Sequence, residues 1–523
     1  MLKHYVHCHQ PFDLNKGGSV GYISTLFESY RRFGIKTTKN GVGVNFLFPN
    51  IENNERIFNR VLADYADDKF KYIDNFENRD GLQNLINERK RWFREVLPKS
   101  ESAKIDWRHI GSVHIHGAYN FLPIYNELIR NGRDDVIKIL TTHNPYKPEL
   151  EDMELISRGR TWKEADIRTL KYFYNERDKA AFGLCDALIF HSEYSMEGYY
   201  KYWPEFEQII KNKRIYFCTT SGQRKQSNIS KELLRSVYGI EKDAKVFLYL
   251  GRFVNVRGYD ILIKAAREIL SRDNNIYFLV VGESSKTSEI VSDRWIQIPF
   301  TTIPGNFLSA ADACICPNRG SLFDLSMVEV MASGCPLICS KVGGYKYLEN
   351  RTSGVFYIEP ENVDQLISTI LCFTSKTNNE IEEYKKDNIK LYDNDFDLKY
   401  FNQRYSNVID QIYSDFNVQD CFTIKSNVKQ FEFDKNQGKY TENEFVVTKP
   451  VSDVLLKQTM PTKKEAKISA NKPIQATISK TNTLSEKERK LRKLKRTPYL
   501  YFRDFFLKKK NSFIYAVKKM MKH

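Results

Sequence analysis

Short runs of β-branched and aromatic residues alternate with amphipathic stretches from the start of the chain to about residue 370. An apolar run of about four to eight residues predicts a buried strand, and apolar positions three or four residues apart predict a helix. We therefore expect strands at 3–9, 111–116, 137–143, 187–192, 245–251, 276–282, 313–317 and 336–340. Helical patterns lie between most of them, as at 260–272 and 326–334, and this alternation predicts parallel βαβ units in a doubly wound α/β fold.

The expected strands form two groups, separated by the polar stretch KNKRIYFCTTSGQRKQSNIS at 211–230. A chain of 523 residues is long enough for two large cores, because single cores stop growing near about 250–300 residues. We predict a Rossmann-like domain over 1–214, a second over 215–394, and helices over 395–421 that cross back to the first. Beyond Cys421 the chain is rich in Lys, Thr, Ser, Asn and Gln, which favours a flexible linker over 422–484.

The last segment, 485–523, regains an amphipathic pattern and carries most of the positive charge. Of the formal net charge of +16, residues 486–523 contribute +11. Ser485 with Glu488 matches a capping box, and Thr497-Pro498 resembles a second helix start ahead of YLYFRDFFLKKK. A basic segment with aromatic residues fits the surface of an anionic membrane, although docking on this protein or on a partner stays open. Nucleic acid is disfavoured, because no nucleic-acid motif accompanies the basic residues.

Composition excludes several other classes of protein. Hydrophobic residues make up 41% of the chain, yet no run approaches the roughly 20 apolar residues of a membrane-spanning helix. The start MLKHYVHCHQPF lacks the layout of a signal peptide, so we expect a cytoplasmic protein, held at the inner membrane face by its tail. The nine cysteines are scattered without a CxxC pair, which predicts reduced thiols and no zinc site.

Two arginines follow the strand expected at 245–251. Gly251 ends this strand, Arg252 comes directly after it, and Arg257 precedes Gly258 where a helix begins. Ligands of open α/β sheets bind at the carboxyl ends of strands, and guanidinium groups make bidentate contacts to phosphate. These arginines are therefore candidates for binding a diphosphate, the alternative being two solvated surface residues.

A second candidate stretch runs from Gly320 into the helix expected at 326–334. The amides around Asp324 to Met327 would present the positive end of that helix to an anionic ligand. Glu329 lies one turn inside the helix, where its carboxylate is placed to accept hydrogen bonds from two ribose hydroxyls. The alternative is a glutamate on a solvated face, which its apolar neighbours Val328 and Val330 make less favourable.

At this point the sequence resembles a known family. GRFVNVRG at 251–258 is similar to the GRxxxxKG motif, and SLFDLSMVEVMASGCPLICSKVGG at 321–344 to the ExFGxxxxEAMAxGxPVVAxxxGG motif, of the retaining GT-B glycosyltransferases of family four. In the first half KGGSVGY, VHIHGAY, LTTHNP and ALIFHSEY resemble that family's glycine loop, HxH segment, second histidine strand and closing strand. The resemblance covers roughly residues 1–417 and implies two Rossmann-like domains that face each other across a cleft.

The resemblance also implies roles for individual residues. Arg252 and Arg257 would bind the nucleotide diphosphate, Glu329 the ribose, and Gly17 with Gly18 would let the backbone approach the phosphates. His116 would contact the donor sugar near the reacting carbon, with His114 as the less favoured candidate for that contact, and His143 and His191 are expected to be structural. The same motif adds further donor-binding positions, namely Ser321, Phe323, Leu325 and Ser326.

Two positions depart from the family motif. Ser321 stands where the first glutamate of the motif belongs, and Asp324 stands in place of the glycine. Asp324 would either supply a catalytic carboxylate or act only as a helix N-cap. Its F-D-L loop is similar to one in some bacterial surface-polysaccharide glycosyltransferases, which favours an active variant.

The resulting hypothesis is a retaining, hexosyltransferase-type glycosyltransferase. It would move a sugar from a nucleotide diphosphate, with a UDP-sugar favoured, to a glycan or lipid-linked acceptor of bacterial capsule or lipopolysaccharide synthesis. The family's same-face mechanism implies that arginines and helix amides stabilise the diphosphate, with no metal and no further cofactor. A nucleotide-sugar epimerase and a non-catalytic GT-B subunit remain the alternatives.

Overall fold

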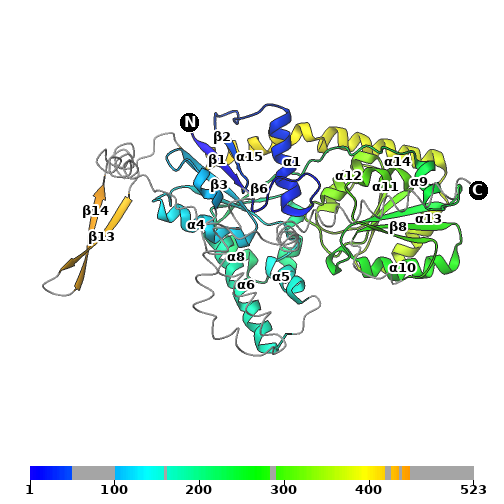
Figure 1. Cartoon of the computed structure of the whole chain (residues 1–523), viewed down its shortest axis with the longest axis horizontal. Coiled ribbons are helices and arrows are strands. Elements are labelled where there is room, and N and C mark those ends of the chain that lie inside the picture. The colour runs from blue at the N-terminus through cyan, green and yellow to red at the C-terminus, as the bar shows by residue number, and fades with distance from the viewer. Residues whose placement is uncertain (50–99, 158–161, 283–289, 419–425, 435–438, 448–523) are drawn as a thin grey trace, which may run out of the picture. The chain divides into compact units, whose positions relative to one another are not determined.

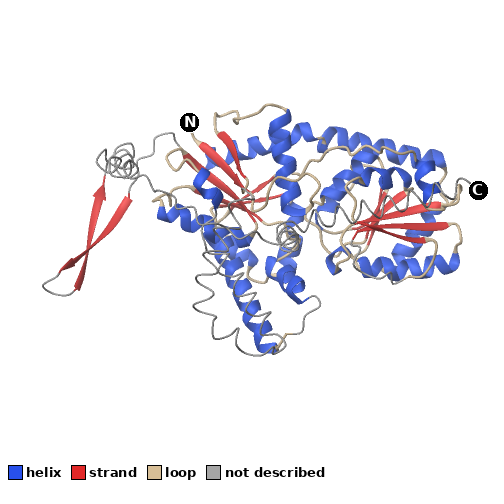
Figure 2. Ribbon diagram, in the orientation of Figure 1, coloured by secondary structure: helices blue, strands red, loops and turns tan. Residues whose placement is uncertain are grey.

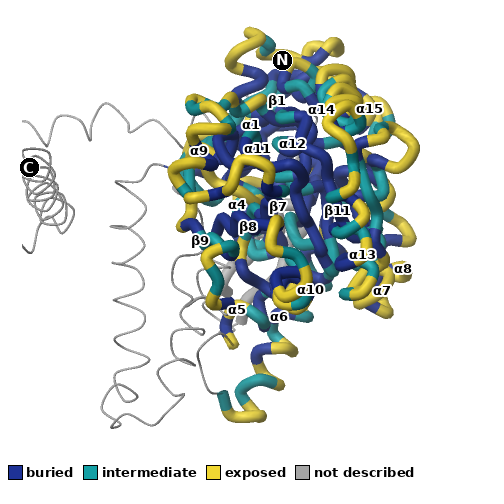
Figure 3. Tube along the Cα trace, turned by 90° about the vertical axis from the view of Figure 1, so that its right-hand side faces the viewer, coloured by how far each residue is buried: buried dark blue, intermediate teal, exposed yellow. Residues whose placement is uncertain are grey.

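The computed structural model describes residues 1–49, 100–157, 162–282, 290–418, 426–434 and 439–447. Within these residues the chain forms two parallel six-stranded sheets, each flanked by helices, as Figure 2 shows. The expected α/β fold is therefore confirmed. Figure 3 shows buried residues along the strands and the inner sides of helices, and exposed residues mainly on the outer turns.

The first sheet has the strand order β2-β1-β3-β4-β5-β6. Its strands are β1 (Lys3–His7), β2 (Gly43–Leu47), β3 (Ile110–His116), β4 (Ile137–Thr141), β5 (Ala187–Phe190) and β6 (Arg214–Phe217). All pair in parallel, and β1 lies between β2 and β3. The chain therefore adds β2 on one side of β1 and then β3 and all later strands on the other side. This reversal of the direction of sheet growth lies between β1 and β3.

Helices cover both faces of the first sheet. They are α1 (Gly18–Arg32), α4 (Phe121–Arg130), α5 (Pro148–Ser157), α6 (Glu164–Leu184), α7 (Glu197–Tyr202) and α8 (Phe206–Ile210). One core cluster joins the sheet to α4, α6 and α8, and a second joins its other face to α1. Successive side chains of a strand point to opposite faces, so β4 supplies Leu140 to the first cluster and Ile139 to the second, whereas β3 supplies apolar residues only to the first.

The second sheet has the order β12-β11-β10-β7-β8-β9. Its strands are β7 (Lys245–Leu250), β8 (Ile276–Gly282), β9 (Trp295–Pro299), β10 (Ala313–Cys316), β11 (Leu337–Ser340) and β12 (Val355–Ile358). Here the direction of growth reverses between β7 and β10, which are hydrogen-bonded neighbours. In β7, Val246 and Leu248 enter one core cluster, whereas Phe247 and Tyr249 enter the other.

Helices also cover both faces of the second sheet. They are α9 (Lys231–Val237), α10 (Tyr259–Arg272), α11 (Pro304–Ala310), α12 (Leu325–Ser333), α13 (Val363–Thr374) and α14 (Asn378–Leu391). Residues of α9, α11 and α12 pack on one face, and residues of α10 and α13 pack on the other. Gly334 ends α12 in the left-handed conformation with φ of 76°, as its position in the sequence predicts.

The chain returns to the first domain through α15 (Phe401–Asp415), which packs on α1. Figure 1 shows α14 beside the second sheet and α15 beside the first. The Ser29 hydroxyl donates a hydrogen bond of 2.7 Å to the carbonyl of Leu398, and the Tyr30 hydroxyl lies 2.6 Å from that of Ser406.

The predicted domain boundary at 214/215 falls inside β6, so the first domain extends at least to Phe217. The sequence did not indicate this, because β6 is an edge strand among polar residues.

The segment from 422 onward differs from the prediction at one place. The structure describes an antiparallel hairpin of β13 (Ser426–Asp434) and β14 (Lys439–Val447), which pairs Phe433 with Tyr440. The prediction of a flexible linker over 422–484 did not anticipate this hairpin, because its apolar residues are sparse and its charged residues many. The rest of that segment and the tail at 485–523 lie outside the described residues.

Two further expectations concern thiols and membranes. The eight cysteines of the described ranges are free thiols, and all but Cys372 are buried. Among the helices that the structure describes, none is long and apolar enough to cross a membrane.

Candidate active site

The predicted site residues lie where each sheet reverses its direction of growth. In open α/β sheets, ligands bind outside the carboxyl ends of the strands at such points. The loop with Gly17 and Gly18 follows β1, and His116 ends β3, so both lie at the reversal point of the first sheet. Arg252 and Arg257 follow β7, and the stretch 321–329 follows β10, so both lie at the reversal point of the second.

Arg257 and Asp324 form an ion pair at the start of α12. The Asp324 Oδ2 atom also accepts hydrogen bonds from Asn318 Nδ2 at 3.0 Å and from the Tyr345 hydroxyl at 2.9 Å. Three donors therefore converge on one carboxylate oxygen. Burial is the largest single influence and opposes the charge of Arg257, but the combined attraction of Asp324, Tyr345 and Tyr249 raises the pKa of Arg257 above its usual value.

Asp324 occupies the N-cap position of α12, yet its side chain makes no capping hydrogen bond. The carboxylate turns to Arg257 instead, so the capping interpretation does not explain it. The first amides of α12, at Leu325 and Ser326, have no acceptor within the helix and carry its positive end. Arg257, Asp324 and these amides thus form one charged group.

Two further predicted site residues of this loop, Ser321 and Phe323, are buried. Phe323 packs edge-on to Tyr347 and Phe396 at centroid distances of 5.3 and 5.6 Å, so its ring belongs to the core. Ser321 is 3% exposed, its carbonyl accepts from the amide of Gly344 at 3.1 Å, and its Oγ has no hydrogen-bond partner among the described residues. A buried hydroxyl without a partner is costly, which marks Ser321 as an unusual position.

Glu329, the expected ribose ligand, has a partner that the sequence did not reveal. Its Oε1 atom lies 2.8 Å from the ammonium of Lys225, a residue between β6 and α9. Lys225 also passes close to α11, because a Cβ added to Gly305 would lie 2.3 Å from the Lys225 carbonyl oxygen. Lys225 therefore places a further cation beside Glu329, and its backbone lies against the start of α11.

Arg252 reaches from the second domain to the first. Its Nη2 atom lies 3.3 Å from Glu151 Oε1 in α5, and half of its side chain is exposed. Glu151 Oε2 accepts a hydrogen bond of 2.6 Å from Asn144. An exposed pair of this length contributes little to stability, so Arg252 is free to exchange partners.

The glycine loop of the first domain is open on its outer side. Gly18 has φ of 62°, a left-handed conformation that favours glycine, and Gly17 caps the start of α1. A Cβ added to either residue would meet no described atom within 4 Å. A Cβ added to Gly21 would lie 2.8 Å from Leu325 Cδ1, so the amino ends of α1 and α12 meet.

His116 belongs to a group of histidines inside the first domain. Its Nδ1 atom lies 2.9 Å from His143 Nε2, and the Tyr22 ring contacts both imidazoles. Its Nε2 atom is buried without a hydrogen-bond partner among the described residues. Burial, with a smaller contribution from His114, lowers the pKa of His116 well below its usual range, so the ring is neutral.

Burial also lowers the pKa values of four other histidines of the first domain. Burial lowers the pKa of His4 to about 3 and that of His191 to about 4. Burial lowers the pKa values of His114 and His143 well below the usual range. We refer to these five residues as the histidine cluster: His4, His114, His116, His143 and His191.

Further contacts hold the loops of the second domain against the first. Glu197 of α7 accepts from the amide of Gly343 at 2.8 Å and from Lys346 at 2.9 Å. The Ser195 hydroxyl donates to the carbonyl of Leu322 at 2.7 Å. These contacts hold the loop before α12 and the turn after β11 beside the first domain.

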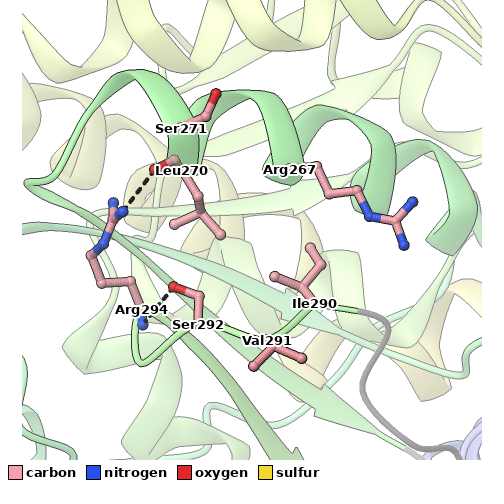
Figure 4. A pocket seen from close by; sticks show the side chains of 7 residues that line it. All are labelled: Arg267, Leu270, Ser271, Ile290, Val291, Ser292 and Arg294. Atoms are coloured by element: carbon pink, nitrogen blue, oxygen red, sulfur yellow. Dashed lines mark hydrogen bonds between the residues drawn. The ribbon is translucent and has the colours of Figure 1, made fainter.

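A pocket of about 420 Å³ lies elsewhere on the second domain, between α10 and the segment before β9 (Figure 4). Arg267, Leu270 and Arg294 line it, and Arg294 donates to the Leu270 carbonyl at 2.7 Å. The end of α10 and the start of β9 are at the amino edge of the sheet. The pocket therefore lies at the opposite edge from the predicted site and contains none of its residues.

Part of the chain is similar to known protein sequences. Residues 244–375 match the family model described as glycosyl transferases group 1. Over 293 residues the chain is 26% identical to the lipopolysaccharide 1,2-N-acetylglucosaminetransferase of Salmonella typhimurium, covering 51% of this chain and 66% of that protein. Over 137 residues it is 26% identical to the poly(ribitol-phosphate) alpha-N-acetylglucosaminyltransferase of Staphylococcus aureus, covering 24% of this chain and 28% of that protein.

A solved structure shares the arrangement of the two sheets. The catalytic domain of starch synthase IV from Arabidopsis thaliana superposes with a TM-score of 0.53 at 11% identity, covering 79% of this chain and 99% of that one. At this identity the likeness concerns the fold alone. The chain therefore has the GT-B fold and carries a glycosyl transferases group 1 domain at residues 244–375.

Proposed function

We propose that this chain is a retaining glycosyltransferase that transfers a sugar from a nucleotide diphosphate to a glycan or lipid-linked acceptor of a bacterial surface polysaccharide. The two relatives named above are N-acetylglucosamine transferases of lipopolysaccharide and of a ribitol-phosphate polymer. A UDP-sugar that carries N-acetylglucosamine is therefore the first donor to test.

One observation supports the proposal most strongly: the amino ends of α1 and α12 meet beside Arg257. Helix amino ends and guanidinium groups both attract phosphate, and Gly17 with Gly18 leaves the approach to α1 open. A diphosphate here would contact amides from both domains. Arg252 would join it by leaving Glu151, and Glu329 would hold the ribose with Lys225 beside it.

We propose that the transfer takes place on one face of the sugar. The bond between the anomeric carbon and the diphosphate oxygen breaks, and the acceptor oxygen bonds to that carbon on the same face. The acceptor proton passes to an oxygen of the leaving phosphate. Arg257, Arg252 and the first amides of α12 would stabilise the charge that grows on the diphosphate, which is the role that a metal ion has in other transferases.

Asp324 is the residue through which this site departs from its relatives. Its Oδ2 atom is committed to three donors, whereas no partner of Oδ1 is found among the described residues. We propose that Oδ1 faces the donor sugar and supports the positive charge at the anomeric carbon. His116, whose buried Nε2 atom lacks a partner in the described part of the chain, would contact the same sugar from the first domain.

The acceptor and the cellular site are part of the same proposal. We propose that the enzyme acts in the cytoplasm and that the basic tail at 485–523 holds it at the anionic inner membrane face. Lipid-linked acceptors would be reached there. The support for the tail is its sequence alone.

The test is a panel of UDP-, GDP-, ADP- and dTDP-sugars, followed by the shift in melting temperature and by slow hydrolysis of the donor. We expect one class of donor to raise the melting temperature, and Arg257→Ala to remove that shift. Arg267→Ala, at the opposite edge of the same sheet, is the matched control and should keep it. If no donor stabilises the wild-type protein, the enzymatic proposal is wrong.

A further inference from the structure

A chain of buried polar side chains crosses the first sheet beneath α15. Each member lies between 2.6 and 2.9 Å from the next, and each is at most 5% exposed. The chain joins α15 to strands β1, β3 and β4 of the sheet. We call it the relay, and its members in order are Tyr413, Ser112, His4, Tyr405, His114 and Thr141.

The direction of the relay is fixed at its inner end. The Thr141 hydroxyl donates its only proton to the backbone carbonyl of Ile189 at 2.7 Å, because a carbonyl oxygen can only accept. Toward His114, Thr141 must therefore accept, so the proton of the His114 ring is on Nε2 at 2.7 Å. The Nδ1 atom of a neutral His114 is then an acceptor.

The same reasoning orders every link toward the outer end. The Tyr405 hydroxyl donates to His114 Nδ1 at 2.7 Å, so its oxygen accepts from His4 Nε2 at 2.8 Å. His4 Nδ1 is then an acceptor for the Ser112 hydroxyl at 2.6 Å, and Ser112 accepts from Tyr413 at 2.9 Å. The alternative acceptor of Tyr413, the Lys3 carbonyl, is farther away at 3.4 Å.

This ordering requires that the His4 and His114 rings are neutral, and their burial favours the neutral form. Burial lowers the pKa of His4 to about 3 and that of His114 well below its usual range. Inside a protein a fully satisfied polar network is rigid, whereas one missing member leaves buried groups without partners. The relay therefore holds each ring in one tautomer and one orientation.

The inner end of the relay lies against the histidine that the proposed function places at the donor sugar. The centroids of the His114 and His116 rings are 4.0 Å apart. His116 in turn lies 2.9 Å from His143 through its Nδ1 atom. A change in the orientation of His114 would displace His116, because close-packed interiors transmit such shifts.

We propose that Tyr405 of the returning helix α15 is a positioning residue for the His116–His143 pair, acting through His114. This inference rests on the proposed function for the role of His116. In this proposal the return of α15 to the first domain has a role in catalysis, because α15 supplies the tyrosine that orients the histidines of the site.

The test uses the protein labelled with ¹⁵N at histidine, with resonances assigned by removing one histidine at a time. In the wild type we expect His4 and His114 both to be neutral with the proton on Nε2. A proton on Nδ1 of either ring overturns the ordering of the relay. This measurement needs no variant of Tyr405 and no donor, so it does not depend on the proposed function.

Two tyrosines of the same helix give a matched pair of variants. Tyr405→Phe removes the central link, so we expect the ¹⁵N resonances of His114, His116 and His143 to shift. Tyr413→Phe removes only the outermost link, so those resonances should stay, because the order is fixed from the Thr141 end. Equal shifts in both variants, or shifts in neither, would refute the positioning role.

Kinetics add a readout that a purely structural role would not give. With a donor that turns over, we expect Tyr405→Phe to lower kcat about tenfold, since small misplacements of catalytic groups have effects of this size or more. The KM for the donor should stay within about twofold, and Tyr413→Phe should change neither constant by more than that. A loss in Tyr405→Phe that appears only in KM contradicts the inference. Absence of turnover in the wild type would instead contradict the proposed function.

Discussion

Replacement of Asp324 by asparagine separates the hydrogen bonds of this side chain from its negative charge. Asp324→Asn keeps the size of the side chain and one oxygen acceptor for Asn318 and Tyr345. It removes the negative charge opposite Arg257. The variant therefore tests whether the carboxylate competes with the donor diphosphate for Arg257.

The structure gives two magnitudes for this change. Removal of one partner from a fully buried ion pair costs about 3–5 kcal/mol, but the Arg257 side chain is 25% exposed and asparagine still accepts hydrogen bonds. We therefore expect a loss of about 2 kcal/mol in the free energy of unfolding without ligand. Two negative charges about 4 Å apart near a protein surface repel by about 4 kcal/mol. With most of this screened by Arg257, about 1.4 kcal/mol remains, which is a tenfold change in affinity.

The assay combines urea unfolding with calorimetric titration of UDP. We expect Asp324→Asn to be less stable than the wild type, yet to bind UDP about tenfold more tightly. If Oδ1 also supports the anomeric charge, kcat falls by about 100-fold in the same variant. Weaker binding of UDP would refute the competition, and an unchanged kcat would refute the catalytic role of Asp324.

Three other predictions concern Glu329, the histidine cluster and the basic tail. Glu329→Gln should weaken UDP binding about tenfold by removing a charged acceptor of the ribose; unchanged affinity by calorimetry would mean that Glu329 serves only its ion pair with Lys225. The residues of the histidine cluster have lowered pKa values in the folded state, so below pH 6.5 the unfolded state binds more protons than the folded state. The free energy of unfolding measured in urea should therefore fall between pH 6.5 and pH 4, by up to about 1.4 kcal/mol per pH unit for each ring. A flat profile between pH 6.5 and 5 would contradict this. Deletion of 485–523 should abolish co-sedimentation with anionic vesicles, and undiminished co-sedimentation would exclude the tail as the membrane anchor.

The sequence predicted the inner strands of both sheets and missed the outer ones. The eight expected strands correspond to β1, β3, β4 and β5 in the first sheet and to β7, β8, β10 and β11 in the second. The missed strands are β2, β6, β9 and β12, and each lies at the edge of its sheet. An edge strand is only partly buried, so its residues need not form a continuous apolar run. Thus β8 is buried throughout, whereas β6 has two exposed residues among four.

The positions of the candidate site were more predictable than its contacts. Motif spacing placed Arg257, Asp324 and Glu329 at the carboxyl edge of the second sheet, where the structure has them. The ion pair between Arg257 and Asp324 and the pairing of Glu329 with Lys225 were not predicted. These partners come from segments about 67 and 104 residues apart in the chain, and a single sequence contains no signal of such pairing.

The contacts of the histidines could not be predicted from the sequence either. His143 was expected to be structural, because a histidine at the end of a strand is usually satisfied within the core. The structure places it in hydrogen-bond contact with His116, and places Tyr405 against His114, from which it is 291 residues away in the chain. Only the return of α15 to the first domain brings these side chains together. The contact could not have been read from the pattern of either segment alone.

The central claim, that this chain is a retaining glycosyltransferase, is tested most directly by the configuration of the sugar that it releases. The wild-type protein is incubated with a nucleotide diphosphate sugar that stabilises it, and the first sugar formed is followed by proton NMR before it mutarotates. The account predicts a sugar with the same anomeric configuration as the donor, and no release by Arg257→Ala. A sugar of inverted configuration, or release that does not depend on Arg257, would contradict it.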